Sequence, residues 1–244
     1  MLEDAFDFDV FKNHVNMSKE NMYREFFREN RDSIKVKKEP VVIRNLIKIS
    51  EATLSLSNEK GFSEMTMRDL SAGAGLSMGA LYSYFSNKDE LLDMIQQQSI
   101  KVATKVLDDE LAGIEDSHLK LKRAIYAHLY LSEIMHPWFY FSFMEAKSLT
   151  KQVKKKAIEL ELFTEKIFID IIEQGKQDST FRDVNKELAA GAIKAMLQDW
   201  YLKRWKFEMR NIPVEEYAGF FMDFVESYLL SLKLESRNLK LGKK

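Results

Sequence analysis

Residues 66–88 carry hydroxyl, phenol and cationic side chains on and around two short helical patterns. Thr66, with Asp69 three residues later, marks the start of the first pattern. Gly75 ends that pattern, and Ser77 starts the second. Side chains of these types donate hydrogen bonds to phosphate oxygens and to base edges. Two short helices that meet at a glycine-containing turn indicate a helix-turn-helix, whose second helix lies in the major groove of DNA.

The residues around this turn form a longer motif. It reads Ala74-Gly75-Leu76-Ser77, then Gly79-Ala80-Leu81-Tyr82-Ser83-Tyr84-Phe85, and then Lys88-Asp89-Glu90-Leu91-Leu92. Together these segments resemble the DNA-binding domain of the TetR family of bacterial transcriptional regulators, over roughly residues 41–100. A looser match, Thr180-Phe181-Arg182-Asp183-Val184, resembles the loop before the family's eighth helix.

The resemblance implies an all-α fold, with an N-terminal three-helix helix-turn-helix domain and a larger helical domain for ligand binding and dimerisation. We expect the DNA-binding domain at residues 38–100, the larger domain at 101–234, and a polar, basic tail at 235–244. The 9 glycines and 3 prolines agree with a helical fold, because strand-and-turn architectures need more of both. Apolar residues that recur every three or four positions predict helices at residues 41–60, 87–113, 117–136, 137–149, 151–176, 185–207 and 213–234.

Residues 1–37 form an extension that the family does not normally carry. Residues 1–33 hold five basic and eight acidic side chains, so DNA is not the expected partner of this segment. The extension could be partly helical or mobile, and it could pack on its own chain or on another subunit. The sequence leaves these alternatives open.

The resemblance further implies that the protein binds double-stranded DNA as a homodimer at a palindromic operator. The two recognition helices of such a dimer enter successive major grooves about 34–36 Å apart. A basic cluster at the start of the first helix adds local attraction for phosphate, although residues 38–105 hold eight basic and eight acidic residues. The implied phosphate contacts are Thr66, Tyr82, Tyr84 and Lys88, the implied base contacts are Arg68, Ser77, Met78 and Ala80, Gly79 belongs to the recognition helix, and Arg44 belongs to the basic cluster.

An aromatic segment marks the larger domain. Five aromatic residues lie within positions 138–143 and cannot all face one side of a helix. The equivalent domain of the family holds a small effector, and ligand pockets are mostly apolar. We therefore expect a pocket for a hydrophobic or aromatic effector, such as an acyl chain, while the alternative for each single ring is ordinary core packing. The expected ligand-binding residues are Trp138, Phe139, Phe141, Met144, Phe163, Phe168, Met196 and Trp200.

The last two predicted helices carry more apolar surface than one helix face needs. Small residues on the first of them allow close approach, so the pair can dock against its two-fold copy as a four-helix bundle. The alternative is the core of a monomer. The expected dimer contacts are Ala192, Phe221, Phe224 and Tyr228.

The sequence offers little for catalysis, so we expect no enzyme, no catalytic residue, no cofactor and no metal. Cysteine is absent, no glycine-rich loop could cradle a phosphate, and the four histidines lack the four-residue spacing of a helical metal site. No apolar run reaches the ~20 residues of a membrane span. The N-terminus does not resemble a signal peptide, so a soluble, cytoplasmic protein without a membrane partner is expected.

The expected function is therefore a ligand-responsive transcriptional regulator, and specifically a repressor that a small apolar effector releases from DNA. Two alternatives remain open. One is an activator of the same family, and the other is a helical interaction protein regulated through residues 1–37 instead of by a ligand. The motif keeps the residues implied to contact phosphate, which argues against a protein that has lost DNA binding. These residues include Tyr82, Tyr84 and Lys88.

Overall fold

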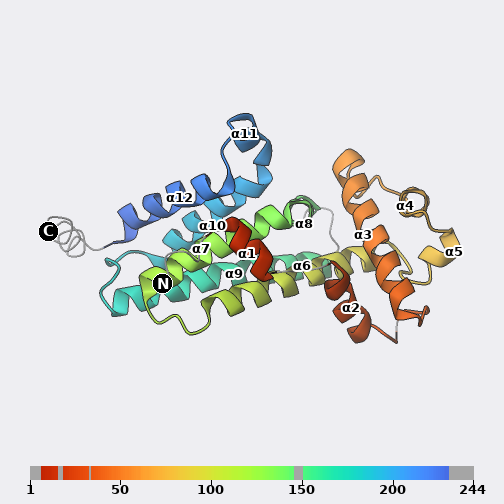
Figure 1. Cartoon of the computed structure of the whole chain (residues 1–244), viewed down its shortest axis with the longest axis horizontal. Helices are drawn as coiled ribbons and strands as arrows, with labels where there is room; N and C mark the ends of the chain where they lie inside the picture. The colour runs from red at the N-terminus through yellow and green to blue at the C-terminus, as the bar shows by residue number, and fades with distance from the viewer. Residues whose placement is uncertain (1–6, 16–18, 33, 146–150, 231–244) are drawn as a thin grey trace. The chain divides into compact units, whose positions relative to one another are not determined.

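The computed structural model describes residues 7–15, 19–32, 34–145 and 151–230, and within these ranges the chain folds into helices (Figure 1). The predicted all-α class is confirmed. The β pairing in the described part is a single isolated bridge between Phe181 and Leu230. The predicted tail at residues 235–244 lies outside the described residues.

The chain divides into two compact units, and each unit combines segments that are distant in sequence. Residues 16–102 and 137–159 form one unit, which we call the helix-turn-helix unit. The described residues within 7–15, 103–136 and 160–230 form the other, which we call the large unit. The division falls within α6 (Lys88–Leu111) and again between residues 159 and 160, whereas α8 (His136–Met144) belongs almost entirely to the helix-turn-helix unit.

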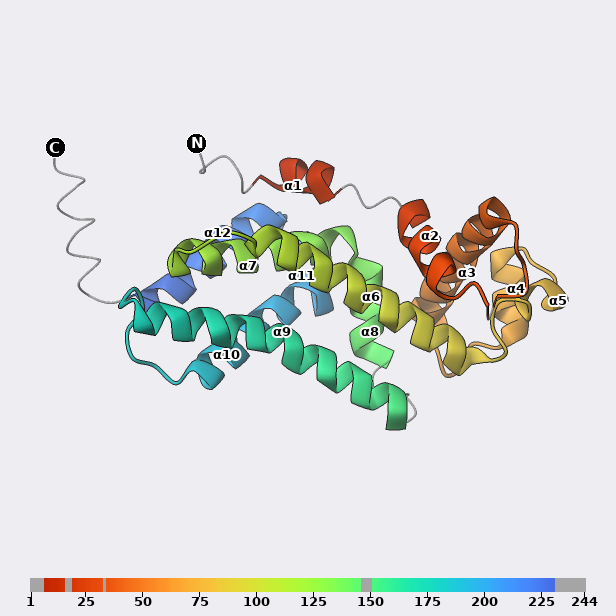
Figure 2. The ribbon, with the colours of Figure 1, turned by 90° about the horizontal axis from the view of Figure 1, so that it is seen from below.

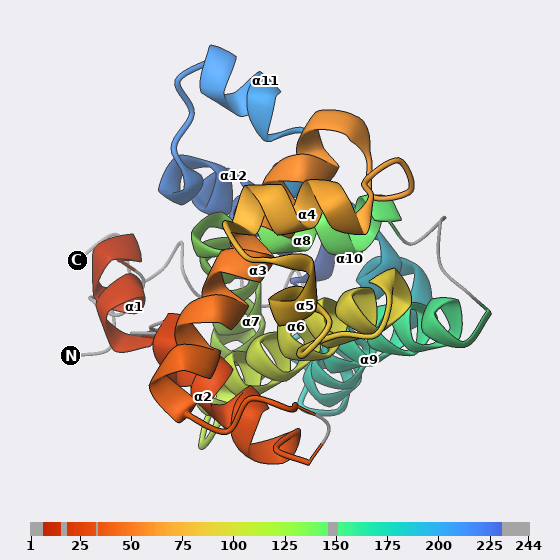
Figure 3. The same cartoon turned by 90° about the vertical axis from the view of Figure 1, so that its right-hand side faces the viewer.

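Part of the N-terminal extension belongs to the core of the helix-turn-helix unit. α2 (Lys19–Glu29) packs along α3 (Glu39–Lys60), as Figure 3 shows. The spacing of the apolar residues of α2 places them on one face of the helix, and that face is buried. The buried residues are Met22, Tyr23, Phe26 and Phe27.

The other part of the extension packs in the large unit. α1 (Phe8–Val15) lies against α7 (Ser117–Ile134), and the two helices can be followed in Figure 1. Phe11 is buried, and the rings of Phe8 and Phe11 meet the Tyr130 ring edge-on, at centroid distances of 5.2 and 5.5 Å. The two helices of one extension therefore belong to two different units.

The large unit also contains α9 (Lys151–Gln177) from residue 160 onward, together with α10 (Lys186–Leu202), α11 (Arg204–Met209) and α12 (Val214–Leu229). The single helix expected at residues 185–207 is thus wrong, because the chain breaks at Lys203. A network centred on Glu133 of α7 holds this break in place. The Arg204 guanidinium donates two hydrogen bonds of 2.9 Å to the Glu133 carboxylate, and Trp200 Nε1 donates a third of 3.1 Å.

The loop between α9 and α10 is held against the end of α12. The Phe181 N–H donates to the Gly175 carbonyl at 2.8 Å, and the Arg182 N–H donates to the Leu229 carbonyl at 2.9 Å. The Phe181 ring covers Gly175 so closely that a Cβ at residue 175 would lie 2.0 Å from it. A side chain at this position would therefore force the loop to move.

Candidate nucleic-acid interface

The first helix of the turn motif starts at a fully formed capping box, which confirms the cap predicted at Thr66. The Asp69 N–H donates to Thr66 Oγ1 at 3.1 Å, and the Thr66 N–H donates to Asp69 Oδ2 at 2.8 Å. The Lys60 ammonium lies 2.7 Å from the same carboxylate oxygen. Together with Thr66, Lys60 holds the pKa of Asp69 below its usual range. This carboxylate therefore joins the end of α3 to the start of α4 (Met67–Ala74).

The turn between the two short helices depends on one glycine. Gly75 has φ 63° and ψ 37°, a left-handed conformation that glycine adopts without a steric penalty. The Leu76 N–H donates to the Ser71 carbonyl at 3.0 Å, and the Ser71 hydroxyl donates to the Leu76 carbonyl at 2.5 Å. Ser77 then caps α5 (Met78–Leu81) by accepting the Ala80 N–H at 3.2 Å. The turn therefore holds α4 and α5 in a defined orientation.

The recognition segment is shorter as a helix than the motif indicates. α5 has four residues, and residues 82–84 continue as a turn. The expected base contacts are accessible to different degrees: Arg68 on α4 and Ser77 are exposed, whereas Met78 and Ala80 are half-buried. Thr66, Gly79 and Tyr82 are exposed as well, and Tyr82 shows 43% of its surface to solvent. The exposed residues among them are accessible to a partner, as a contact with DNA requires.

Tyr84 differs from the other expected contacts, because its ring is buried with 4% exposure. Its hydroxyl accepts a hydrogen bond of 2.9 Å from Asn45 Nδ2 on α3. Burial raises the pKa of this phenol. The structure therefore places the Tyr84 ring in the core, and the expected phosphate contact rests on the hydroxyl alone. Sequence reasoning missed Asn45, although a polar side chain among the apolar positions of the helix expected at residues 41–60 is its signal.

Besides Arg68 on α4, two cationic contacts lie on the helices that flank the turn motif, α3 and α6. Lys88, the first residue of α6, donates to the Ser63 carbonyl at 2.9 Å, and its ammonium lies 4.9 Å from the centre of the Phe62 ring. Arg44 is exposed on α3, one residue before Asn45. The DNA contacts of all ten residues predicted for this interface stay predictions, because the structure describes the protein alone.

Two family models match the chain, one over the turn motif and one over helices that follow it. The model described as bacterial regulatory proteins of the tetR family matches residues 49–95, and the tetracyclin repressor-like C-terminal domain matches residues 115–206. The chain belongs to the TetR family. The resemblance drawn from the motif is thereby confirmed.

Several known regulators are similar to this chain in sequence or in fold. The transcriptional repressor KstR2 of Mycobacterium tuberculosis (strain ATCC 25618 / H37Rv) is 25% identical over 157 residues, which are 64% of this chain and 78% of that protein. The crystal structure of PfmR from Thermus thermophilus is 28% identical, with a TM-score of 0.65 over 75% of this chain and 99% of PfmR. FadR from Bacillus subtilis, solved with stearoyl-CoA, has a TM-score of 0.60 at 16% identity, over 73% of this chain and 96% of FadR.

The large unit of this TetR protein presents an apolar surface on α10 and α12. Its members recur at helical spacing and are exposed, although their side chains are apolar and most of them are large. They are Leu188 (73% exposed), Phe220 (62%), Phe224 (55%) and Tyr228 (47%), together with exposed Ala192. We call these five residues the α10–α12 face. The expected contact Phe221 is not among them, because its side chain is fully buried within the protomer.

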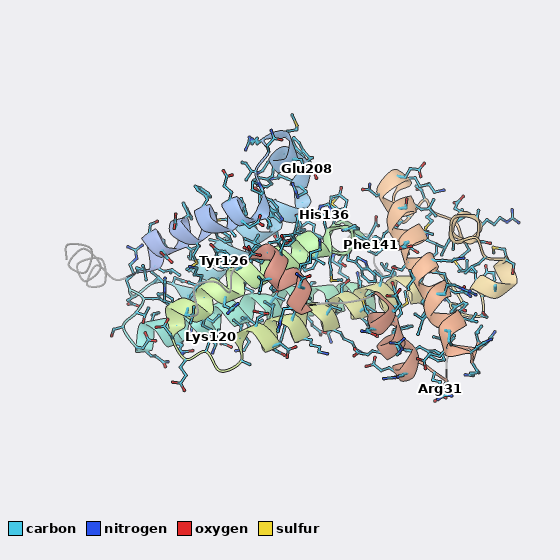
Figure 4. The ribbon with its side chains drawn as sticks, in the orientation of Figure 1. Arg31, Lys120, Tyr126, His136, Phe141 and Glu208 are labelled. Carbon is cyan, nitrogen blue, oxygen red and sulfur yellow. The ribbon has the colours of Figure 1, made fainter. Side chains whose placement is uncertain are left out.

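The residues expected to line a ligand pocket are divided between the two units. Trp138 and Phe141 are buried in the helix-turn-helix unit, where Phe141, labelled in Figure 4, packs edge-on against Phe62 at 5.6 Å. Phe168 and Trp200 are buried in the large unit. The others are half-buried (Phe139, Met196) or exposed (Met144 at 48%, Phe163 at 42%). A pocket shared by all eight stays a prediction.

Metal binding and membrane crossing each require features that the described part of the chain lacks. Among the described residues, no three His, Asp or Glu side chains are grouped so that they could hold a metal ion. None of the described helices combines the length and the apolar composition that a membrane crossing requires.

Proposed function

We propose that this TetR regulator is a repressor that binds a palindromic operator as a homodimer through Arg68, Ser77 and their neighbours. The observation that carries the proposal is the capped turn, which leaves Thr66, Arg68 and Tyr82 exposed around a short helix. The α10–α12 face supports the dimer, because a helix-turn-helix protein of this kind needs paired half-sites. The relative KstR2 is a transcriptional repressor by name, which supports repression over activation.

Substitutions at the turn test the DNA-binding part of the proposal. Operator DNA is first selected from a random library with the wild-type protein. Arg68→Ala is then expected to weaken binding by about 1–3 kcal/mol and to relax sequence preference, because a bidentate base contact is lost. Lys88→Ala is expected to weaken binding and to reduce the slope of affinity against salt by about one unit, because one phosphate contact is lost. Gel shifts over a range of salt concentrations measure both effects.

Lys105→Ala provides the matched control, since Lys105 is an exposed cation on α6 that belongs to the large unit. It changes the net charge by the same amount and should leave affinity and salt slope unchanged. Operator affinities equal to wild type for both Arg68→Ala and Lys88→Ala would place the recognition surface elsewhere. A selection that enriches no sequence would favour the interaction-protein alternative.

We further propose that a small apolar effector binds the large unit and releases the operator. FadR was solved in complex with stearoyl-CoA, and the core of the large unit in this chain is rich in aromatic and aliphatic side chains. An effector present at 100 times its dissociation constant should stabilise the folded protein by about 2.7 kcal/mol. The same compound should weaken the gel shift if it binds the DNA-free conformation more tightly than the DNA-bound one. A ligand shifts an equilibrium between two conformations only by the difference of its affinities for them. Fatty acids, acyl thioesters and aromatic acids are the compounds to screen, and stabilisation without operator release would contradict the coupling.

A further inference from the structure

A buried lysine lies on α10 in the large unit. Lys194 is 4% exposed, whereas lysine is almost never fully buried unless it is paired. It shares one helix stripe with Ala190 and Leu197, which are both fully buried. Burial lowers the pKa of the Lys194 ammonium, and the neighbouring Glu161 carboxylate opposes that shift. A cation in this position needs an anion beside it.

The partners of this ammonium come from α9, which runs next to α10 in Figure 2. Lys194 Nζ donates to Thr164 Oγ1 at 2.7 Å, and Thr164 is itself buried. The nearest Glu161 carboxylate oxygen is 3.5 Å away, which is longer than the 2.7–2.9 Å of a strong charge-assisted hydrogen bond. Gln198 Nε2 donates to the other oxygen of Glu161 at 2.8 Å, so Lys194 and Gln198 share this carboxylate.

The two ends of the Lys194–Glu161 pair lie in different environments. The Lys194 side chain is 5% exposed and the Glu161 side chain is 43% exposed. The pair therefore runs from the interior of the large unit to its surface. A carboxylate that is already partly in water loses little when another anion replaces it at the ammonium, because its own desolvation is small.

A third helix adds a neutral polar group. His128 of α7 is buried, and burial together with the positive charge of Lys194 holds its pKa well below the ordinary value. His128 therefore contributes no positive charge at neutral pH, and Lys194 supplies the attraction for an anion. Apolar side chains lie one turn away on both helices: Phe168 follows Thr164 on α9, and Leu197 follows Lys194 on α10, both buried.

We infer that Lys194 and Thr164 bind the carboxylate of an effector that carries an apolar tail, and that this carboxylate displaces Glu161 from the ammonium. The inference rests on the proposed function, because it names the chemical class of the proposed effector. The ammonium binds the acid group directly. The Thr164 hydroxyl, which donates to the Glu161 carbonyl at 3.1 Å without a ligand, turns to donate to the acid, and the tail packs against the neighbouring aromatic and aliphatic side chains. Displacement of Glu161 changes the contact between α9 and α10, which gives the ligand a structural consequence within the large unit.

Matched acids and alcohols test the inference on the full chain. Decanoic acid and 1-decanol share a tail, as do phenylacetic acid and 2-phenylethanol, and only the acids carry the anion. We expect the wild-type protein to bind at least one acid more tightly than its alcohol in calorimetric titrations. Lys194→Met should weaken binding of that acid by about 10- to 100-fold, because a charge-assisted hydrogen bond is lost, and should change binding of the alcohol by about twofold or less.

Two further variants complete the experiment. Glu161→Gln removes the competing carboxylate and should tighten binding of the acid. Lys166→Met is the matched control, because Lys166 is an exposed lysine on the same helix as Thr164, with its ammonium paired to Asp170. It should bind the acid as wild type does. Methionine has nearly the length of lysine and no charge to bury, so Lys194→Met should stay folded, and circular dichroism checks this.

The failures of the two proposals are distinguishable. If acids and alcohols bind equally and release the operator equally, the effector part of the proposed function stands and the carboxylate site is wrong. Acid binding that Lys194→Met leaves intact also overturns the site. If no acid binds, the inference fails, and the alcohols and thioesters then decide whether an apolar effector exists. If Lys194→Met fails to fold, two other results still test the site. The wild-type protein should bind the acid more tightly than its alcohol, and Glu161→Gln should bind the acid more tightly than wild type does.

Discussion

Replacing Phe224 with glutamate is expected to convert the protein to a monomer that no longer binds the full operator. Phe224 lies on the α10–α12 face with 55% exposure, so the protomer itself has little reason to unfold. In a two-fold dimer the change occurs in both copies, and each glutamate would be buried without a partner. A buried unpaired charge costs roughly 3–5 kcal/mol, which is enough to separate an interface of ordinary strength. Sedimentation and gel shifts on the selected operator measure the two outcomes.

Met209→Glu is the matched control for this experiment. Met209 ends α11 and is 78% exposed, but it lies outside the α10–α12 face. The same charge introduced there should leave a dimer that binds the operator. A Phe224→Glu protein that sediments as a dimer would show that the subunits meet through another surface. A monomer that binds the full operator with wild-type affinity would instead separate dimerisation from DNA recognition.

The turn motif could be predicted from the sequence because its signals are local. Thr66 and Asp69 are three residues apart and form the capping box, and Gly75 occupies the left-handed position that favours glycine. The length of α5 could not be predicted in the same way. Tyr84 and Phe85 continue the apolar pattern and both are buried, yet the regular helix ends at Leu81 and residues 82–84 form a turn, so the local pattern does not mark the end of the helix.

Other features depend on residues that are distant in sequence. The break between α10 and α11 involves Arg204 and Glu133, which are 71 residues apart. No local sequence pattern predicts an ion pair between such distant residues, so the pattern of apolar residues predicts one continuous helix. Lys194 had a signal that was not used: Ala190, Lys194 and Leu197 follow the four- and three-residue steps of a buried stripe. A charged residue on such a stripe indicates a buried ion, and its partner can be found only from the fold.

The sequence does not predict where the N-terminal extension packs. The apolar residues of α2 predict a helix with one buried face, but not the surface that covers it. The structure supplies that surface on α3, and it places α1 in the large unit against Tyr130. An acidic segment therefore contributes to the cores of both units through its aromatic side chains, while its described charged side chains are exposed or half-buried.

Tyr84→Ala is expected to lower the free energy of unfolding by about 3–5 kcal/mol, because truncating a buried aromatic ring leaves a cavity. Its position in the motif predicts a phosphate contact, but its 4% exposure means that alanine would damage the fold and the DNA surface together. Tyr84→Phe separates the two effects. It keeps the ring and removes only the hydroxyl that accepts the Asn45 hydrogen bond, so it should cost about 1 kcal/mol of stability.

Tyr82→Ala completes this comparison, because Tyr82 is exposed and sits two residues earlier. It should change the free energy of unfolding by about 0.5 kcal/mol or less and weaken operator binding by about 1–2 kcal/mol. Urea titrations measure stability, and gel shifts measure affinity. If Tyr84→Phe binds the operator like wild type, the Tyr84 hydroxyl does not contact phosphate, and the residue acts through the core alone. If Tyr84→Ala is as stable as wild type, the ring does not pack as the structure shows, and the contact of Tyr84 with Asn45 of α3 must be revised.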